Sequence, residues 1–265
     1  MVPVSVVIIT KNKGEHIIRC LNAARQITND VVIVDNGSTD DTLAIARLFG
    51  CRVFHTAWYG YGSNKNIGIE LAKYDWILSI DADEVPDNEL ANSLEGIDYQ
   101  NENIVYDIRF KSYFGEKRVR YGNWGRDHHT RLFNRKLVKW TEPNVHETLL
   151  IPSFVKKKKL GGSFIHHSVK NVDECTEKAL RYARLSAEKY FKAGKRSNFI
   201  NLYLSPLFAF IKTYILLLGF LDGKEGWHIA RITFKNRWFK YHYLNHLETI
   251  GHRKPALETS LAPEY

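Results

Sequence analysis

Three acidic residues directly after a short apolar run are the best suited in this sequence to carry chemistry. Residues 77–80 read Ile-Leu-Ser-Ile, and Asp81, Asp83 and Glu84 follow. An Asp-x-Asp pair at the end of a strand can hold Mg²⁺ or Mn²⁺ through one or two oxygens and leave the other positions to water and phosphate oxygens. Such an ion would neutralise a diphosphate leaving group. The alternative is that Asp81 and Asp83 cap the next helix.

A second acidic cluster lies about one strand–helix unit earlier. Residues 31–42 read VVIVDNGSTDDT, so Asp35 ends an apolar run and hydroxyl-bearing residues follow it. A carboxylate at this place can accept hydrogen bonds from a ribose hydroxyl or a base N–H. The alternative is that Ser38, Thr39 or Asp40 caps a helix over residues 41–49, which would not exclude a ligand role for Asp35.

Farther along the chain, Arg131 and His166 carry groups that suit phosphate. A guanidinium favours bidentate contact with phosphate oxygens, although a strand-edge charge facing water is the alternative for Arg131. His166 ends a short strand and could be a further metal ligand, a diphosphate donor or a plain histidine. Trp124 and Tyr121 could form an apolar platform for a sugar ring, or simply pack.

The elements that must position these residues alternate in type over the first 80 residues. The apolar runs predict strands over 4–10, 31–35, 52–55 and 76–80, with helices over 15–26, 40–49 and 64–73 between them. This alternation is typical of βαβ units around a parallel sheet. Asn12, Asp35 and Asp81 would then lie at carboxyl ends of strands, where open α/β sheets bind ligands.

The second half of the chain has a different pattern. From residue 104 to about 167, short aromatic-rich runs such as 104–114, 131–134 and 163–167 predict a mixed or antiparallel extension of the sheet. A basic amphipathic helix is expected over 173–192, with Asp173 as its N-cap and Gly194 as its stop. We therefore expect an α/β catalytic domain over 1–168, a helical region over 169–253 and a loose tail over 254–265.

Composition narrows the class of protein further. The 265 residues are 44% hydrophobic and 25% charged, as in ordinary globular chains. Three widely spaced cysteines indicate neither a disulfide framework nor a zinc cluster, which fits a reducing cytosol. The apolar N-terminus lacks a basic segment and a cleavage site, so a buried first strand is expected there. A net charge of +9 indicates an anionic partner.

Residues 199–221 are apolar apart from a narrow polar stripe. The segment has about the length that spans a bilayer, but Asn201, Ser205, Pro206 and Lys212 interrupt it. Because a basic helix precedes it, the segment suits a position in the membrane interface better than a crossing. The alternative is a helix buried against the catalytic domain. We expect a cytoplasmic protein, peripheral on the inner face of the cytoplasmic membrane.

Four motifs occur in order and together resemble family-2 glycosyltransferases: residues 5–12 (SVVIITKN), 34–40 (VDNGSTD), 62–68 (GSNKNIG) and 81–84 (DADE). Later residues resemble the subgroup of lipopolysaccharide-core β-glucosyltransferases, and they extend the resemblance to about residue 245: Trp124, Asp127, 131–133, 145–147, His166 and 219–223. The resemblance implies a GT-A nucleotide-sugar-binding fold, with a mixed and mainly parallel sheet flanked by helices.

The resemblance also implies a UDP-sugar donor, UDP-glucose above all, with Mg²⁺ or Mn²⁺ as cofactor. Asp83 would be the principal metal carboxylate and His166 a further ligand. Six residues would contact the nucleotide-sugar, the first three at its uridine end and Arg131 at the diphosphate: Thr10, Asn12, Asp35, Asn66, Asp81 and Arg131.

On the acceptor side, the resemblance implies an inverting single displacement in which a carboxylate deprotonates the acceptor hydroxyl. Many relatives use the Asp of a Glu-Asp pair, whereas this chain has His146 and Glu147. We assign Glu147 as the catalytic base. Trp124, Asp127 and His146 would bind the acceptor, a saccharide or glycolipid of the cell envelope or lipopolysaccharide.

Two other classes of function are weaker alternatives. A nucleotidyltransferase acting on a sugar phosphate would present a glycine-rich phosphate loop after the first strand, but residues 10–14 (TKNKG) contain one glycine. A nonenzymatic membrane or nucleic-acid binding module would explain the positive charge but not the ordered acidic strand ends. We expect no nucleic-acid partner.

Overall fold

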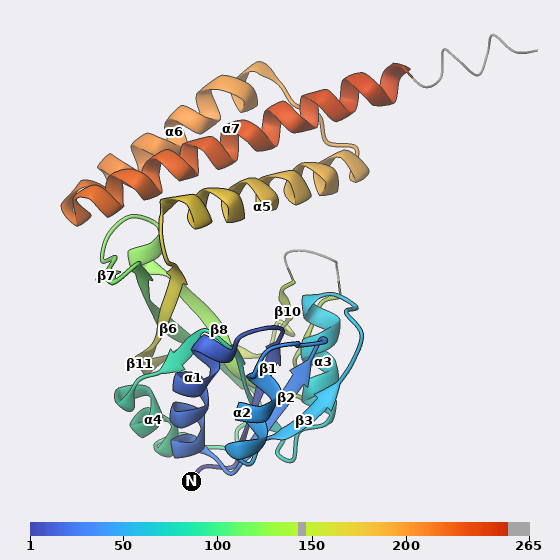
Figure 1. The fold of residues 1–265 in the computed structure, drawn as a ribbon, viewed down its shortest axis with the longest axis vertical. Helices are drawn as coiled ribbons and strands as arrows, with labels where there is room; N and C mark the ends of the chain where they lie inside the picture. The colour runs from blue at the N-terminus through green and yellow to red at the C-terminus, as the bar shows by residue number, and fades with distance from the viewer. Residues whose placement is uncertain (143–146, 254–265) are drawn as a thin grey trace, which may run out of the picture. The chain divides into compact units, whose positions relative to one another are not determined.

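The computed structural model describes residues 1–142 and 147–253 (Figure 1). The chain divides into two compact units. The first consists of Met1–Tyr113 and Arg126–Ser168, and the second of Phe114–Gly125 and the chain from Val169 onward. A segment from within the predicted catalytic domain, Phe114–Gly125, thus groups with the helices that follow Val169.

The first unit begins with the predicted alternation of strands and helices: β1 (Val4–Thr10), α1 (Gly14–Ile27), β2 (Asp30–Asp35), α2 (Thr42–Leu48), β3 (Arg52–His55), α3 (Tyr61–Glu70) and β4 (Trp76–Asp81). β1 pairs in parallel with β2 and with β4, and β2 with β3. In this register Thr10 lies opposite Asp35, and Ile9 lies opposite Asp81. The carboxyl ends of the three central strands therefore meet at one edge.

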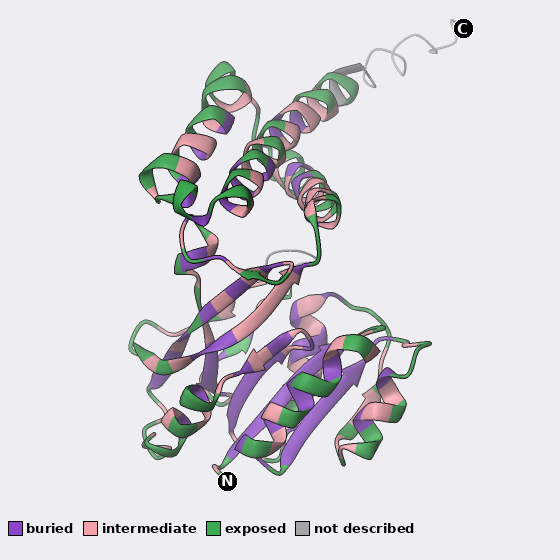
Figure 2. Cartoon of the chain, turned by 60° about the vertical axis from the view of Figure 1, so that its left-hand side comes forward, coloured by how far each residue is buried: buried purple, intermediate pink, exposed green. Residues whose placement is uncertain are grey.

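Successive side chains of β1 enter two different apolar layers, because a strand turns alternate residues to opposite faces. Figure 2 shows the central strands of the sheet coloured as buried. Val6 and Ile8 pack with residues of α1, α2 and α4 (Asn88–Glu95), whereas Val7 and Ile9 pack with α3. Burial on both faces explains why the parallel strands are continuous apolar runs. Gly68 lets α3 lie close, since a Cβ there would be 2.5 Å from Val7 Cγ1.

Antiparallel strands extend the sheet beyond β4. The strands of the sheet lie in the order β3-β2-β1-β4-β8-β6-β11-β5. β8 (His128–Asn134) pairs antiparallel with β4 and with β6 (Ile104–Phe114), and β11 (Lys156–Val169) with β5 (Glu84–Pro86). A separate antiparallel pair is formed by β9 (Lys139–Trp140) and β10 (Leu149–Leu150). The predicted α/β fold, a mixed sheet flanked by helices, is confirmed.

In the second unit, α5 (Val172–Lys192) and α6 (Ser205–Ile211) pack along α7 (Lys224–Arg253), as Figure 1 shows. Shorter elements complete the unit: β7 (Lys117–Arg118), η1 (Trp124–Arg126), the π-helical turns η2 (Ile200–Leu204) and η3 (Lys212–Leu216), and η4 (Gly219–Asp222). Buried Asp222 accepts the backbone N–H of Tyr121 at 2.8 Å and so ties the unit's two chain segments together. Within the described ranges, no helix has the length and apolar character needed to cross a membrane.

One predicted helix cap is corrected. Asn171, not Asp173, caps α5, because its side chain accepts the N–H of Glu174 at 2.9 Å and Asp173 lies inside the first turn. α2 begins at Thr42, and of its three candidate caps Asp40 accepts the Thr42 N–H at 3.1 Å, which excludes Ser38 and Thr39 as the cap. Those two residues are instead used in the loop after β2.

Candidate active site

Asp35 ends β2 and is fully buried, and the loop that follows satisfies its carboxylate. Oδ2 accepts the N–H groups of Gly37 at 2.9 Å and Ser38 at 3.1 Å, and the Ser38 hydroxyl donates to Oδ1 at 2.5 Å. Burial alone would raise the pKa of Asp35, but these hydrogen bonds hold it below its ordinary value. The strand end thus presents a rigid, ionised carboxylate.

Asn12 connects the loop after β1 to the loop after β2. Its backbone is left-handed, with φ 51°, a conformation that asparagine tolerates better than most residues. Its N–H donates to Ser38 Oγ at 2.9 Å, and its Oδ1 accepts the N–H of Thr39 at 2.8 Å. Nearby Thr10 Oγ1 is buried and has no hydrogen-bond partner among residues 1–142 and 147–253. Contact of Thr10, Asn12 and Asp35 with uridine stays a prediction.

Asn66 of α3 is engaged within the protein. Its amide donates to the carbonyl of Trp140 at 3.0 Å and accepts the Trp140 N–H at 3.0 Å, as a neighbouring strand would. These two bonds fasten α3 to β9. The predicted contact of Asn66 with the nucleotide-sugar stays a prediction.

Asp81 lies between two cations at the end of β4. Its Oδ1 is 3.3 Å from Lys65 Nζ, and its Oδ2 is 3.3 Å from an Arg131 nitrogen. Burial would raise the pKa of Asp81, but the charges of Lys65 and Arg131 hold it well below its ordinary range. The alternative that Asp81 and Asp83 cap the next helix is wrong, because Asp87 caps α4 by accepting the N–H of Leu90.

Arg131 joins β8 to the acidic cluster. Its buried guanidinium pairs with Glu84 as well as with Asp81, and Glu84 accepts the Asp81 N–H at 3.0 Å. The two carboxylates raise the pKa of Arg131 against the effect of burial. Burial raises the pKa of Glu84 to about 8, although the ion pair with Arg131 opposes this rise. The alternative of a strand-edge charge facing water is wrong for Arg131, and its contact with phosphate stays a prediction.

Asp83 and His166 offer donors suited to a divalent cation. His166 Nε2 is 3.8 Å from Asp83 Oδ1, and Ser168 Oγ lies 3.1 Å from its Nδ1 and so orients the ring. Two ligands of one octahedral ion, each at about 2.1 Å, lie about 3.0 Å apart in cis or about 4.2 Å apart in trans, so the observed 3.8 Å is within reach of one ion after a small side-chain movement. Lys13 Nζ lies 3.1 Å from the second oxygen of Asp83.

The protein supplies only part of a coordination sphere here. Among the residues that the structure describes, no group of three or more His, Cys, Asp or Glu side chains is arranged to hold a metal. Mg²⁺ and Mn²⁺ commonly bind through one or two protein ligands and take the rest from phosphate and water. The donor set of Asp83 and His166 is compatible with that mode of binding.

Glu147 lies close to the same cluster. Its Oε1 is 3.2 Å from Lys65 Nζ, and that ammonium also contacts Asp81. Lys65 is 3% exposed and lies over the Trp140 ring, 4.5 Å from its centroid. Sequence reasoning missed Lys65. One signal in the sequence could have identified Lys65, because it lies inside the motif over residues 62–68. It is three residues before Gly68, so both lie on the same side of α3.

Two of the three predicted acceptor residues belong to different units. Asp127 is in the first unit, where its Oδ1 is 3.1 Å from His129 Nε2. Trp124 is in the second unit and packs against Phe114, with ring centroids 6.1 Å apart. His146 lies outside the described residues. Acceptor binding by these three residues stays a prediction.

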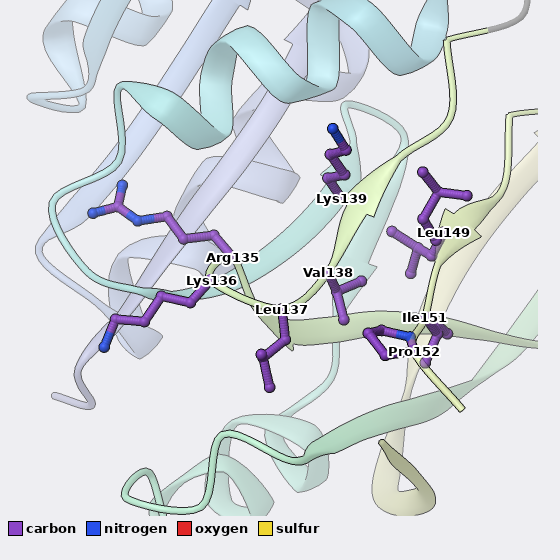
Figure 3. A pocket seen from close by; sticks show the side chains of 9 residues that line it. Arg135, Lys136, Leu137, Val138, Lys139, Leu149, Ile151 and Pro152 are labelled. Atoms are coloured by element: carbon purple, nitrogen blue, oxygen red, sulfur yellow. The ribbon is translucent and has the colours of Figure 1, made fainter. Parts of the chain in front are cut away.

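A pocket of about 660 Å³ lies in the first unit between the β8–β9 turn and β10 (Figure 3). Both apolar and basic side chains line the pocket. The lining residues are Arg135, Lys136, Leu137, Val138, Lys139, Leu149, Leu150, Ile151 and Pro152. None of the predicted site residues is among them. Arg135 and Lys136 form ion pairs with Asp75, which is not part of the acidic cluster of Asp81, Asp83 and Glu84. The pocket therefore does not share the chemistry of that cluster.

Comparison with known proteins gives consistent relatives. A family model described as Glycosyl transferase family 2 matches residues 5–160. An uncharacterized glycosyltransferase of Rickettsia prowazekii is 30% identical over 238 residues, which cover 85% of this chain and 81% of that protein. The lipopolysaccharide core biosynthesis glycosyltransferase LpsC of Rhizobium meliloti is 27% identical over 249 residues, covering 87% and 90%.

Two solved structures show partial likeness. Glucosyl-3-phosphoglycerate synthase from Mycobacterium tuberculosis, in complex with Mn²⁺, UDP and glucosyl-3-phosphoglycerate, matches with a TM-score of 0.35 and 22% identity over 42% of this chain and 44% of that one. TarS of S. aureus matches with a TM-score of 0.47 and 15% identity over 94% and 91%.

Proposed function

Since this chain belongs to glycosyl transferase family 2 and is a glycosyltransferase, we propose that it transfers glucose from UDP-glucose to a saccharide or glycolipid acceptor with inversion at the anomeric carbon. The observation that carries the proposal is the arrangement at the carboxyl edge of the sheet. There Asp83 lies beside His166, and Asp81 and Glu147 share the ammonium of Lys65.

In this proposal different residues at the carboxyl edge of the sheet bind the uridine, the diphosphate and the sugar of the donor. The uridine contacts Thr10, Asn12 and Asp35, whose loops are fastened to each other. Asp83 and His166 would hold a Mg²⁺ or Mn²⁺ ion, and the chemistry such an ion would supply is neutralisation of charge on the diphosphate. Asp81 binds the ribose or the sugar, and Arg131 steadies the diphosphate.

The transfer itself is a single displacement. Glu147 accepts the proton of the acceptor hydroxyl as that oxygen forms a bond to the anomeric carbon. The bond from that carbon to the β-phosphate oxygen breaks, and UDP leaves with the bonding electrons. Attack from the face opposite the leaving group inverts the configuration and gives a β-linked product.

The acceptor belongs, in our proposal, to the cell envelope, as a saccharide or glycolipid of lipopolysaccharide biosynthesis. The LpsC relative is named as a glycosyltransferase of lipopolysaccharide core biosynthesis, which supports this pathway, and it matches along 87% of this chain. Such acceptors are assembled at a membrane, so a membrane-facing surface on the enzyme would be useful to it.

We place the enzyme on the inner face of the cytoplasmic membrane, attached through residues 199–221. Large apolar side chains in this segment are exposed, among them Phe199 at 67%, Leu216 at 60% and Phe208 at 58%. No acidic residue occurs between Glu188 and Asp222, while lysines and an arginine do. Exposed apolar area next to positive charge suits anionic lipid headgroups over an acyl layer.

A panel of donors tests the reaction. The protein is incubated with UDP-glucose, UDP-galactose, UDP-N-acetylglucosamine or GDP-mannose, with Mn²⁺ or with a chelator, and nucleoside diphosphate release is measured. We expect the fastest release with UDP-glucose and Mn²⁺. Equal release in chelator would contradict the metal, and preference for another donor would replace glucose.

A further inference from the structure

The buried ammonium of Lys65 links Asp81, which we assign to the donor, with Glu147, which we assign to the acceptor hydroxyl. Lys65 is 3% exposed, and its Nζ lies 3.3 Å from Asp81 Oδ1 and 3.2 Å from Glu147 Oε1. Trp140 closes another side, with its ring centroid 4.5 Å from Nζ. Burying an ammonium is costly unless charged partners compensate it, and here two carboxylates and an aromatic face do so.

The attachment of α3 does not depend on Lys65. Asn66 makes two hydrogen bonds to Trp140, and Ile69 of the same helix is part of the apolar layer on that face of the sheet. Asp81 has a second cation in Arg131. What Lys65 adds is a connection between Asp81 on β4 and Glu147, which follows β9.

We propose that Lys65 is a positioning residue, which holds the Glu147 carboxylate at a fixed place relative to the donor-side carboxylate Asp81. The proposal rests on the proposed function, since that function makes Glu147 the base. A base acts only within about 3 Å of the proton it takes, and displacement by about 1 Å can cost about 10²-fold in rate.

Two carboxylate partners suit Lys65 to this task. When Glu147 takes a proton from the acceptor, its carboxyl group becomes neutral and no longer balances the ammonium. Asp81 remains 3.3 Å from the same ammonium, so the buried charge of Lys65 stays paired during the reaction. A lysine with Glu147 as its sole partner would instead oppose the transfer of the proton.

A double-mutant cycle tests the link. The variants are Lys65→Met, Glu147→Gln and the double variant, and kcat, the donor KM, UDP affinity by calorimetry and thermal unfolding are measured for each. We expect Lys65→Met to lower kcat by about 10- to 100-fold with UDP affinity within about threefold. In the Glu147→Gln background the same change should lower kcat by less than about threefold, because the group it positions is already inactive.

Two further variants complete the test. Lys65→Arg keeps a cation and should regain part of the lost kcat, and Lys136→Met removes an exposed lysine of the same unit and should change nothing. If Lys65→Met does not fold, the same cycle is run with Lys65→Gln, which removes the charge but keeps a polar side chain, and the same losses are expected.

The outcomes separate this proposal from the proposed function. If Glu147→Gln is impaired but Lys65→Met turns over at the wild-type rate, or if the two losses multiply, Lys65 does not act through Glu147. If Glu147→Gln is fully active, the assignment of the base fails, and the link to Lys65 fails with it.

Discussion

The two units differ in the energetically costly groups they contain: the first buries charged side chains, and the second exposes large apolar ones. The first unit buries charges at the carboxyl edge of its sheet, where Asp35, Lys65, Glu84 and Arg131 are all less than 10% exposed. The second unit exposes large apolar side chains over residues 199–221, of which Ile200 is 59% and Leu221 53% exposed. Buried charge is costly without partners, and exposed apolar area is costly without a cover.

Each unit is therefore suited to a different kind of contact. In the first unit, ionised groups are already held by hydrogen bonds and ion pairs, which suits recognition of a charged, polar molecule. In the second, the exposed apolar segment 199–221 contains no acidic residue, which suits an anionic interface. The following predictions test the two halves of this comparison.

The largest effect is expected from Asp83→Ala. The change removes the carboxylate that we assign to the metal, so turnover of UDP-glucose should fall by at least about 10³-fold, and added Mn²⁺ should not restore it. Asp41→Ala, an exposed acid beside α2, is the matched control and should keep most activity. Metal-dependent turnover in Asp83→Ala at near the wild-type rate would contradict the assignment.

Glu147→Gln should follow, with kcat lowered by about 10²–10⁴-fold, because glutamine keeps the shape but cannot accept the proton. Donor affinity, measured by UDP calorimetry, should stay nearly unchanged. Asp127→Asn is the comparison variant. If it were the impaired one, the base would be Asp127, and Glu147 would have a structural or acceptor-positioning role.

The apolar face of the second unit is tested by Phe199→Ser combined with Phe208→Ser. Loss of two half-exposed aromatic rings should lower binding to vesicles of phosphatidylcholine and phosphatidylglycerol by at least about tenfold in a sedimentation assay. Leu48→Ser is the control, since Leu48 is 86% exposed in the first unit. Unchanged vesicle binding, with loss of self-association instead, would mean that a second copy covers this face.

The smallest effect concerns the start of α5. Asn171→Ala removes a helix cap and should lower the free energy of unfolding by about 1 kcal/mol in urea titrations. Asp173→Ala removes a first-turn charge and should cost about 0.3–0.5 kcal/mol. A larger loss for Asp173→Ala than for Asn171→Ala would restore Asp173 as the more important residue.

Local pattern was enough to predict much of the fold. The strands over 4–10, 52–55 and 104–114 coincide with β1, β3 and β6, because continuous or alternating apolar runs leave few other solutions. It also placed Asp35 and Asp81 at the carboxyl ends of parallel strands. The cap of α5 was misplaced because Asn171 and Asp173 are both good capping residues, and only the backbone decides between them.

Pairing between distant segments could not be read from the sequence. Lys65 meets Glu147 across 82 positions, and Arg131 meets Glu84 across 47. Nothing in the local pattern says which cation faces which carboxylate, because that depends on how β4, β8 and α3 approach one another. Sequence reasoning therefore found most of the acids of the site and missed Lys65, which joins two of them.

Gly68 has a bearing on how this enzyme tolerates mutation. It lies one turn after Lys65, where α3 presses on β1 and β2, and a methyl group there would meet Val7 at 2.5 Å and Val34 at 2.9 Å. The helix would have to lift away from the sheet, and Lys65 would be carried with it. A change at this apolar contact would then resemble an active-site lesion in an activity screen. The distance between α3 and the sheet therefore helps to determine where Lys65 lies in the site.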